Sequence, residues 1–135
     1  MRRYRRSKFS TPHGIAFDHG DNMYVTDMKN YRIQVFNNKD TFVREWKSSG
    51  MGLDKFSETV PGIAIDVNDK VFIVDKINSR VQMFDNIGNH LASWGTDGKG
   101  SQQLHKPEDI SVSNEGTVYV TDTRNSRIQV LQIVE

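Results

Sequence analysis

Cysteine is absent from this chain of 135 residues, which excludes disulfide bonds and thiolate chemistry. No apolar run approaches the roughly 20 residues that a membrane-spanning helix needs, so we expect no membrane segment and no membrane partner. The N-terminus reads MRRYRRSKF and has no apolar stretch behind it, which is not the pattern of a signal peptide. These absences leave the compartment open but favour the cytoplasm.

Helical periodicity and the common catalytic motifs are also missing. No segment of ten or more residues has apolar side chains at a spacing of 3.6, so the sequence predicts essentially no helix. There is no Gly-x-Ser-x-Gly, no P-loop and no dinucleotide-binding Gly-x-Gly-x-x-Gly. We therefore expect no cofactor, and a non-catalytic protein is favoured over an enzyme.

What the chain does contain is one sequence pattern written three times. The windows 14–36, 62–84 and 109–131 align without gaps, and their starting points are 48 and then 47 residues apart. A repeat of this length is typical of a supersecondary unit that buries its apolar faces by stacking on copies of itself. Five positions are identical in all three windows: Ile15/Ile63/Ile110, Asp27/Asp75/Asp122, Asn30/Asn78/Asn125, Arg32/Arg80/Arg127 and Gln34/Gln82/Gln129.

Each window holds three short apolar runs, rich in β-branched and aromatic residues and separated by Gly, Asn and Asp. A fourth run follows in the first two repeats, at 42–46 and 90–94, and both copies end on Trp. Four such runs predict an antiparallel meander, the unit of a β-propeller blade. We expect the core to be formed by Met23/Val71/Val118, Tyr24/Phe72/Tyr119 and Val25/Ile73/Val120.

The recurring pattern Pro-x-Gly-Ile-Ala-x-Asp, followed by Val-x-Asp-x-x-Asn-x-Arg-Ile-Gln-Val-Phe, closely resembles NHL repeats. The Asn-His-Leu triplet for which that family is named corresponds here to 30–32, 78–80 and 125–127, which read Asn-Tyr-Arg, Asn-Ser-Arg and Asn-Ser-Arg. The resemblance covers residues 9–131 and implies a β-propeller, commonly six-bladed. It implies no single activity, because fold and function separate readily.

The sequence divides into a basic tail, 1–8, and a half-propeller, 9–135, with blades at about 9–46, 56–94 and 104–135. The third blade lacks its outer strand. Propellers close with roughly four to eight blades, so three blades leave two apolar faces uncovered. We expect either a homodimer that forms a six-bladed ring or a part of a longer propeller. For the ring, Ile33, Val35, Ile128 and Val130 are predicted near the joint.

The basic tail carries five of the 18 Lys and Arg residues, and the remainder of the chain has 13 of them against 17 Asp and Glu. Such a tail is either an arm for nucleic acid or an acidic partner, or a solubilising segment, and we favour the second.

The Asp-x-x-Asn-x-Arg motif is the strongest recurring polar signal. The carboxylate and the guanidinium flank a four-residue turn and can pair across its neck, while Asn tolerates the left-handed backbone that such turns often require. Because a catalytic site normally occurs once, three copies indicate a structural staple. Its members are Asp27, Asn30, Arg32, Asp75, Asn78, Arg80, Asp122, Asn125 and Arg127.

Charge is sorted between the two rims that such a fold would have. One rim, which we name the linker rim, combines the turns between second and third strands with the inter-blade linkers. Its cations include Lys29, Lys47, Lys55, Lys76, Lys99, Lys106 and Arg124. The opposite rim has Asp18, Asp21, Asp40, Asp66, Asp69, Asp85 and Glu115 against Lys39 and Lys70. This predicts a non-catalytic scaffold that holds a protein segment or a single-stranded RNA on a basic rim. The candidate ligand-binding residues are Lys29, Tyr31, Lys76 and Arg124.

The alternative function is a metal-dependent lyase or lactonase with a site on the propeller axis. His13, in Pro12-His13-Gly14, resembles a zinc ligand of the peptide-amidating lyases, which are NHL-like propellers. The matching positions in the other repeats are Pro61 and Glu108, so the sequence offers one histidine where catalytic zinc takes about three protein ligands. His13 is therefore a weak candidate, and we expect no metal site.

Overall fold

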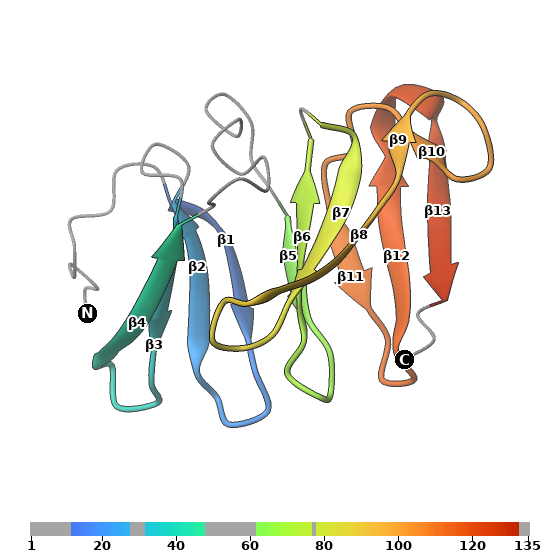
Figure 1. Ribbon diagram of the computed structural model, residues 1–135. Coiled ribbons are helices and arrows are strands. Elements are labelled where there is room, and N and C mark those ends of the chain that lie inside the picture. The colour runs from blue at the N-terminus through green and yellow to red at the C-terminus, as the bar shows by residue number, and fades with distance from the viewer. Residues whose placement is uncertain (1–11, 28–31, 48–61, 77, 133–135) are drawn as a thin grey trace.

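The structure is a computed structural model that describes residues 12–27, 32–47, 62–76 and 78–132. These residues form three antiparallel sheets, each built from strands that follow one another in the sequence (Figure 1). Blade 1 consists of β1 (Pro12–Phe17), β2 (Met23–Asp27), β3 (Arg32–Phe36) and β4 (Phe42–Lys47). Blade 2 consists of β5 (Ile63–Ile65), β6 (Val71–Asp75), β7 (Arg80–Phe84) and β8 (His90–Trp94). Blade 3 consists of β11 (Ile110–Val112), β12 (Thr117–Asp122) and β13 (Arg127–Gln132).

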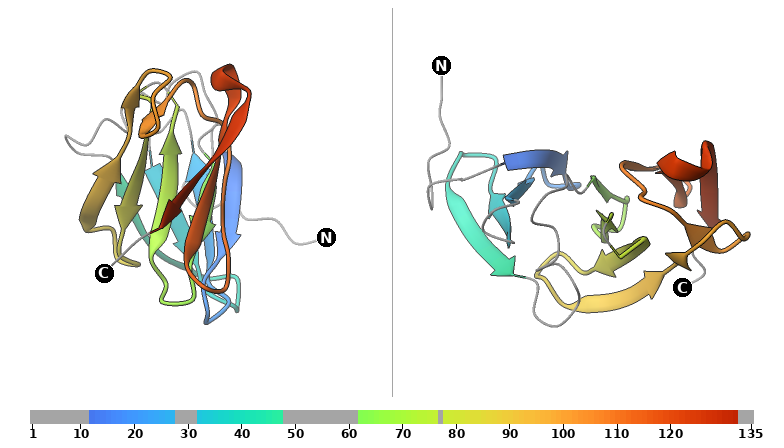
Figure 2. Two further views of the ribbon diagram at one scale, coloured as in Figure 1. Left: turned by 90° about the vertical axis from the view of Figure 1, so that its right-hand side faces the viewer. Right: turned by 90° about the horizontal axis from the view of Figure 1, so that it is seen from above.

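The three blades are arranged side by side along an arc, as the view from above shows (Figure 2). Their inner strands β1, β5 and β11 neighbour one another, and the outer strands β4 and β8 lie on the far side of the arc. The all-β class and the propeller blades predicted from the repeats are thus confirmed. Among the described residues, no helix is long and apolar enough to cross a membrane.

The tight turns on the opposite rim are stabilised by carboxylates. Asp18 Oδ1 accepts hydrogen bonds from the backbone amides of Gly20 and Asn22, each at 2.9 Å. Asp66 repeats this arrangement in blade 2, where its Oδ1 accepts from the amides of Asn68 and Lys70 at 2.9 Å. These side chains substitute for backbone partners in a chain that reverses direction, which is why Asp recurs at the position.

Each blade has two different faces, because alternate residues of each strand point to opposite sides of the sheet. All described blades stack in the same direction along the chain. We call the face toward the next blade in the sequence the forward face, and the other the backward face. Between blades 1 and 2, one core combines Tyr24, Ile33 and Val35 with Ile63, Val71, Ile73 and Phe84. Between blades 2 and 3, a second core combines Ala64, Phe72, Val74, Val81, Met83 and Leu104 with Ile110, Val118 and Val120.

Each outer strand contributes a tryptophan at the predicted equivalent position. Trp46 lies opposite Ile33, and Trp94 lies opposite Val81. The indole of Trp46 contacts both Tyr24 of its own blade and Phe84 of the next, with ring centroids 6.3 and 6.0 Å apart. Trp46 therefore ties two blades together.

One expectation about the core and one about the joint between copies are wrong. Tyr119 was predicted to be buried with Tyr24 and Phe72, but it is 42% exposed. The reason is the direction in which the blades stack. Tyr119 is on the forward face of blade 3, where no described blade follows. Ile33 and Val35 were predicted near a ring joint, but they are on the forward face of blade 1 and pack against blade 2.

The linker after β8 has more structure than predicted. Residues Thr96–Asp97 (β9) and Gln103–Leu104 (β10) form a short parallel pair, and Leu104 is buried beside blade 3. The turn between β12 and β13 contains a short 3₁₀ segment, η2 (Thr123–Asn125), which ends at Ser126 in the left-handed region. This linker and this turn meet on the linker rim.

Candidate functional site

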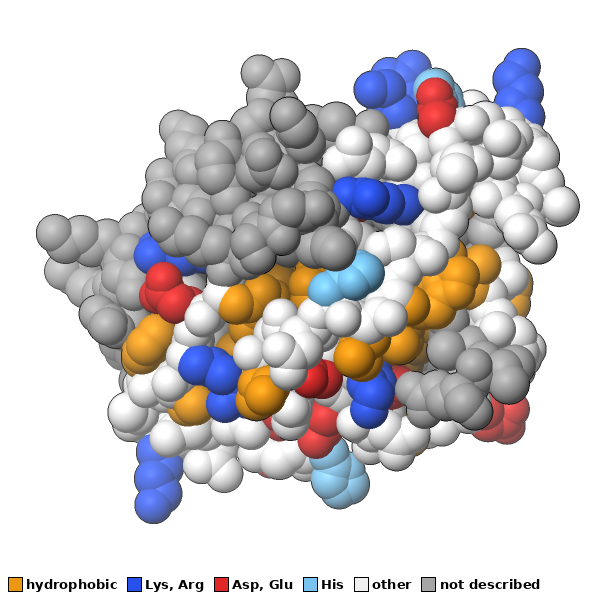
Figure 3. Space-filling model, in the orientation of Figure 1, with side chains coloured by type: hydrophobic (Ala, Val, Ile, Leu, Met, Phe, Trp, Pro, Cys, Tyr) orange, Lys and Arg blue, Asp and Glu red, His pale blue; other side chains and the backbone are white. Residues whose placement is uncertain are grey.

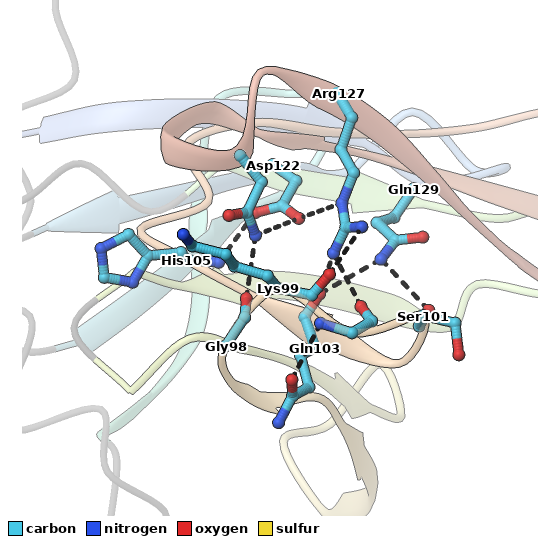
Figure 4. A network of polar contacts seen from close by, with 10 residues as sticks. Gly98, Lys99, Ser101, Gln103, His105, Asp122, Arg127 and Gln129 are labelled. Atoms are coloured by element: carbon cyan, nitrogen blue, oxygen red, sulfur yellow. Dashed lines mark hydrogen bonds and ion pairs between the residues drawn. The ribbon is translucent and has the colours of Figure 1, made fainter.

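The linker rim of blade 3 is built by a network of polar contacts around Asp122 and Arg127 (Figure 4). Asp122 Oδ2 accepts from Arg127 Nε at 2.7 Å and from Asn125 Nδ2 at 3.0 Å, and its Oδ1 accepts from the amide of His105 at 2.7 Å. Asp122 is fully buried. The hydrogen bonds of Asn125, His105 and Arg127 outweigh the effect of burial, so the pKa of Asp122 is lowered.

Arg127 and its neighbours also hold the linker that connects β9 to β10. The Arg127 guanidinium donates to the carbonyls of Lys99, Gly100 and Gln103 at 3.0, 2.8 and 2.9 Å. Asn125 Nδ2 donates to the carbonyl of Gly98 at 2.9 Å, and Gln129 Nε2 donates to the carbonyls of Ser101 and Gln103 at 3.1 Å. The third copy of the motif thus fixes the backbone of a long loop as well as its own turn.

Blade 2 repeats the arrangement around Asp75, which is fully buried. Its carboxylate accepts from Arg80 Nε at 2.9 Å, from Asn78 Nδ2 at 2.9 Å and from Gln82 Nε2 at 3.1 Å. Desolvation is the largest influence here and raises the pKa of Asp75, although the hydrogen bonds from Asn78 and Arg80 act in the other direction. Arg80, Asn78 and Gln82 therefore enclose a carboxylate whose charge is costly to bury.

In blade 1, Arg32 Nη2 lies 3.3 Å from Asp27 Oδ2, and Arg32 Nη1 lies 3.8 Å from Glu45 Oε2. Asn30 lies outside the described residues. The structure thus brings the Asp and Arg of the motif together in all three blades, as the proposed staple requires.

The residues predicted to bind a ligand on the linker rim have different surroundings. Lys29 and Tyr31 lie outside the described residues. Lys76 Nζ contacts Glu108 Oε1 at 2.8 Å, and this contact is the main reason why the pKa of Glu108 is lowered. Arg124 is exposed, next to the buried Asp122 network.

The linker rim also carries carboxylates, beside the cations that the sequence places there. Glu108 neighbours Lys76 and Arg124, and Asp97 lies 2.7 Å from His105 Nδ1 and close to Lys106. Acidic and histidine side chains stand beside Lys and Arg at the upper edge of the face in Figure 3. The described part of this rim is therefore mixed in charge. The linker sequence 95–109 already contains this signal, since Asp97 precedes its two lysines and Glu108 and Asp109 follow them.

The weak metal candidate His13 is an exposed residue of β1. In the part of the chain that the structure describes, no three His, Asp or Glu side chains are grouped so as to hold a metal ion. Glu108, the equivalent position in blade 3, is paired with Lys76.

Comparisons with known proteins agree with this geometry. A family model described as NHL repeat matches residues 9–36 and 104–131. Comparison with curated proteins found no match. Among solved structures, virginiamycin B lyase from Staphylococcus aureus has a TM-score of 0.62 at 16% identity, over 92% of this chain and 42% of that one. A gluconolactonase from Xanthomonas campestris has a TM-score of 0.60 at 15% identity, over 85% of this chain and 36% of that one.

The chain therefore spans about two-fifths of the length of these structural neighbours. At such low identity the likeness shows the fold, while the lyase and lactonase activities belong to those proteins. The repeats, the blade topology and the structural likeness agree: two segments of the chain match the NHL repeat, and the chain is built of β-propeller blades.

Proposed function

We propose that this protein is a non-catalytic binding scaffold that holds a polypeptide segment on its linker rim. The observation that carries the proposal is the fixed loop 98–105. Its backbone carbonyls accept hydrogen bonds from Asn125, Arg127 and Gln129, and the amide of His105 donates to Asp122. A loop held in this way presents the exposed cation Lys99 without a large ordering cost on binding, and the exposed cations Lys106 and Arg124 are on the same rim.

A polypeptide fits this rim better than single-stranded RNA does. Binding of a nucleic-acid backbone depends on cations that are free to replace counterions. On this rim Lys76 already neutralises Glu108, and Asp97 lies near Lys106. A polypeptide with acidic side chains can use Lys99 and Arg124 and donate its own hydrogen bonds to the carboxylates.

We also propose that a second copy of the chain completes the propeller. The forward face of blade 3 exposes Tyr119, Ile128 and Val130 at 42, 65 and 54%. The backward face of blade 1 exposes Ile15 and Phe17 at 57 and 56%, beside Met23 and Val25. These are the two kinds of face that pack together twice within the chain, so a head-to-tail pair of copies reuses an interface that the fold already contains.

Charge reversal on the linker rim tests the proposed ligand site. We expect Lys99→Glu combined with Arg124→Glu to weaken binding of fluorescein-labelled decaglutamate at least tenfold, measured by fluorescence anisotropy at low ionic strength. The matched control is Lys39→Glu with Lys70→Glu, which changes the net charge equally on the opposite rim and should have little effect. Equal losses in both variants would contradict a site on the linker rim. Tighter binding of decauridylate than of decaglutamate would overturn the assignment to a polypeptide.

A further inference from the structure

Asp97 is followed by glycine, the sequence in which the backbone at an aspartate rearranges most readily. In the whole sequence, 97–98 is the single Asp-Gly pair, and no Asn is followed by Gly. Glycine favours the rearrangement because no side chain shields its backbone nitrogen from the neighbouring carboxyl group. Asp97 is also exposed, so water reaches its carboxyl group. This pair is therefore the position at which a spontaneous change of the backbone is expected first.

The rearrangement loses one water molecule and regains one, so the mass of the chain does not change. The backbone nitrogen of Gly98 attacks Cγ of Asp97, a C–N bond forms, and the hydroxyl of the protonated carboxyl group leaves with the amide proton as water. Water that then attacks Cγ of the succinimide restores aspartate. Water that attacks the main-chain carbonyl of Asp97 breaks its bond to the Gly98 nitrogen and gives isoaspartate, in which the backbone runs through Cβ and Cγ. An ionised carboxylate reacts more slowly, because it must first take up a proton.

The fold uses both residues of this reactive pair. Gly98 has a φ of +153°, which other residues rarely adopt, and a Cβ at this position would collide with the side chain of Gln103. The carboxylate of Asp97 joins two parts of the chain. Its Oδ1 accepts a hydrogen bond from Ser79 Oγ in the turn between β6 and β7 at 3.4 Å, and it lies 2.7 Å from Nδ1 of His105, which follows β10. Substitution of either residue would therefore disturb the local structure.

The carboxyl group of Asp97 is held in its ionised, less reactive form. The hydrogen bond with the His105 ring is the main reason why the pKa of Asp97 is lowered, and the charge of Lys106 acts in the same direction. The backbone of His105 is itself fixed by blade 3. Its amide donates to Asp122 Oδ1 at 2.7 Å, and its carbonyl accepts from the amide of Arg124 at 3.1 Å. The imidazole is thus kept in place beside the carboxylate.

The attacking nitrogen of Gly98 is held as well. Its N–H donates to the carbonyl of Leu104 at 3.0 Å, beside the parallel pair in which Asp97 lies opposite Leu104. The carbonyl of Gly98 accepts from Asn125 Nδ2 at 2.9 Å (Figure 4). Leu104 is buried between blades 2 and 3, which fixes the strand that receives the first of these bonds. Ring closure therefore requires β9 to open locally from β10.

We infer that Asp97–Gly98 is the isoaspartate-forming site of this protein and that the fold slows the reaction there, with His105 restraining the carboxyl group. Isoaspartate adds one atom to the backbone of β9 and moves the free carboxylate away from His105 and Ser79. The register of β9 with β10 would then be lost, and with it the fixed position of the loop 98–105. The inference concerns the covalent chemistry of the backbone and stands independently of the ligand proposed on the linker rim.

Comparison of the folded chain with a peptide of the same sequence tests the effect of the fold. The full chain and the synthetic peptide HLASWGTDGKGSQQ, residues 90–103, are incubated side by side. Mass spectrometry with electron-transfer fragmentation then measures isoaspartate at position 97, because cleavage between Cα and Cβ is specific to the rearranged residue. We expect the folded chain to react at least tenfold more slowly than the peptide, since ring closure needs local opening. Equal rates would overturn the inference.

A substitution of His105 tests the restraint on the carboxyl group. We expect His105→Ala to raise the rate of isoaspartate formation about threefold at about pH 5.5, where imidazole groups are charged, and by less at about pH 7.5, where they are mostly neutral. The matched control, His19→Ala, removes an exposed histidine of blade 1 and should leave the rate unchanged. Circular dichroism verifies that both variants fold. A loop that is merely loosened would raise the rate by the same factor at both pH values. That result, or a rate that His105→Ala leaves unchanged, would contradict the role of His105.

Discussion

Replacing Asp75 with alanine is expected to lower the free energy of unfolding by about 3 kcal/mol, because breaking a buried ion pair by removing one partner costs roughly 3–5 kcal/mol. Asp75 is fully buried and accepts hydrogen bonds from Arg80, Asn78 and Gln82. Alanine removes the buried carboxylate that these three donors share. Urea denaturation followed by circular dichroism measures the change.

Two further substitutions separate the causes of that loss. Asp75→Asn keeps the shape and an acceptor oxygen while removing a charge whose burial raises the pKa of Asp75, so we expect a smaller loss than with alanine. Glu115→Ala removes an exposed carboxylate on the opposite rim and should leave the unfolding midpoint unchanged. If Asp75→Ala unfolds at the wild-type midpoint, the motif is not a structural staple.

The second large effect concerns the assembly of two copies. Light scattering at micromolar concentration is expected to give twice the chain mass of 15.5 kDa. The variant Ile15→Lys with Val130→Lys should weaken dimerisation more than a hundredfold. It places a cation on the backward face of blade 1 and another on the forward face of blade 3. In a twofold-symmetric ring each face is used twice, so each substitution acts at both joints.

The control for this experiment is Val67→Lys, the same type of substitution at a residue that is 53% exposed in the turn between β5 and β6. This variant should remain dimeric. A wild-type chain that stays monomeric at micromolar concentration would contradict the closure of a ring by two copies.

The repeats predicted the blades well, because strand periodicity and turn residues are local properties of the sequence. They did not determine which face of a blade meets its neighbour, since Tyr24, Phe72 and Tyr119 look alike as sequence while only the first two have a blade in front of them. The same limit applies to the linker rim. Lys76 is a surface cation in the sequence, but it contacts Glu108 from 32 residues away, and such pairs appear only once the chain is folded.

The pairing of β9 with β10 was missed for a related reason. The segment 95–106 is rich in Gly, Ser and Lys, which indicates a linker. Its order comes from Arg127, Asn125 and Gln129 of the next blade, which bind its carbonyls. Because these contacts come from another part of the chain, the sequence of the segment itself shows no strand periodicity.

The placement of the two tryptophans makes the protein its own optical probe. Trp46 lies at the boundary of blades 1 and 2, within 6.0 Å of Phe84 by ring centroids, so its emission reports on separation of those two blades. Trp94 packs on Phe72 within blade 2 and also lines a cavity beside β13, so its emission reports on events at the other end of the chain. Single-tryptophan variants would therefore show whether the blades unfold together or one after another along the arc.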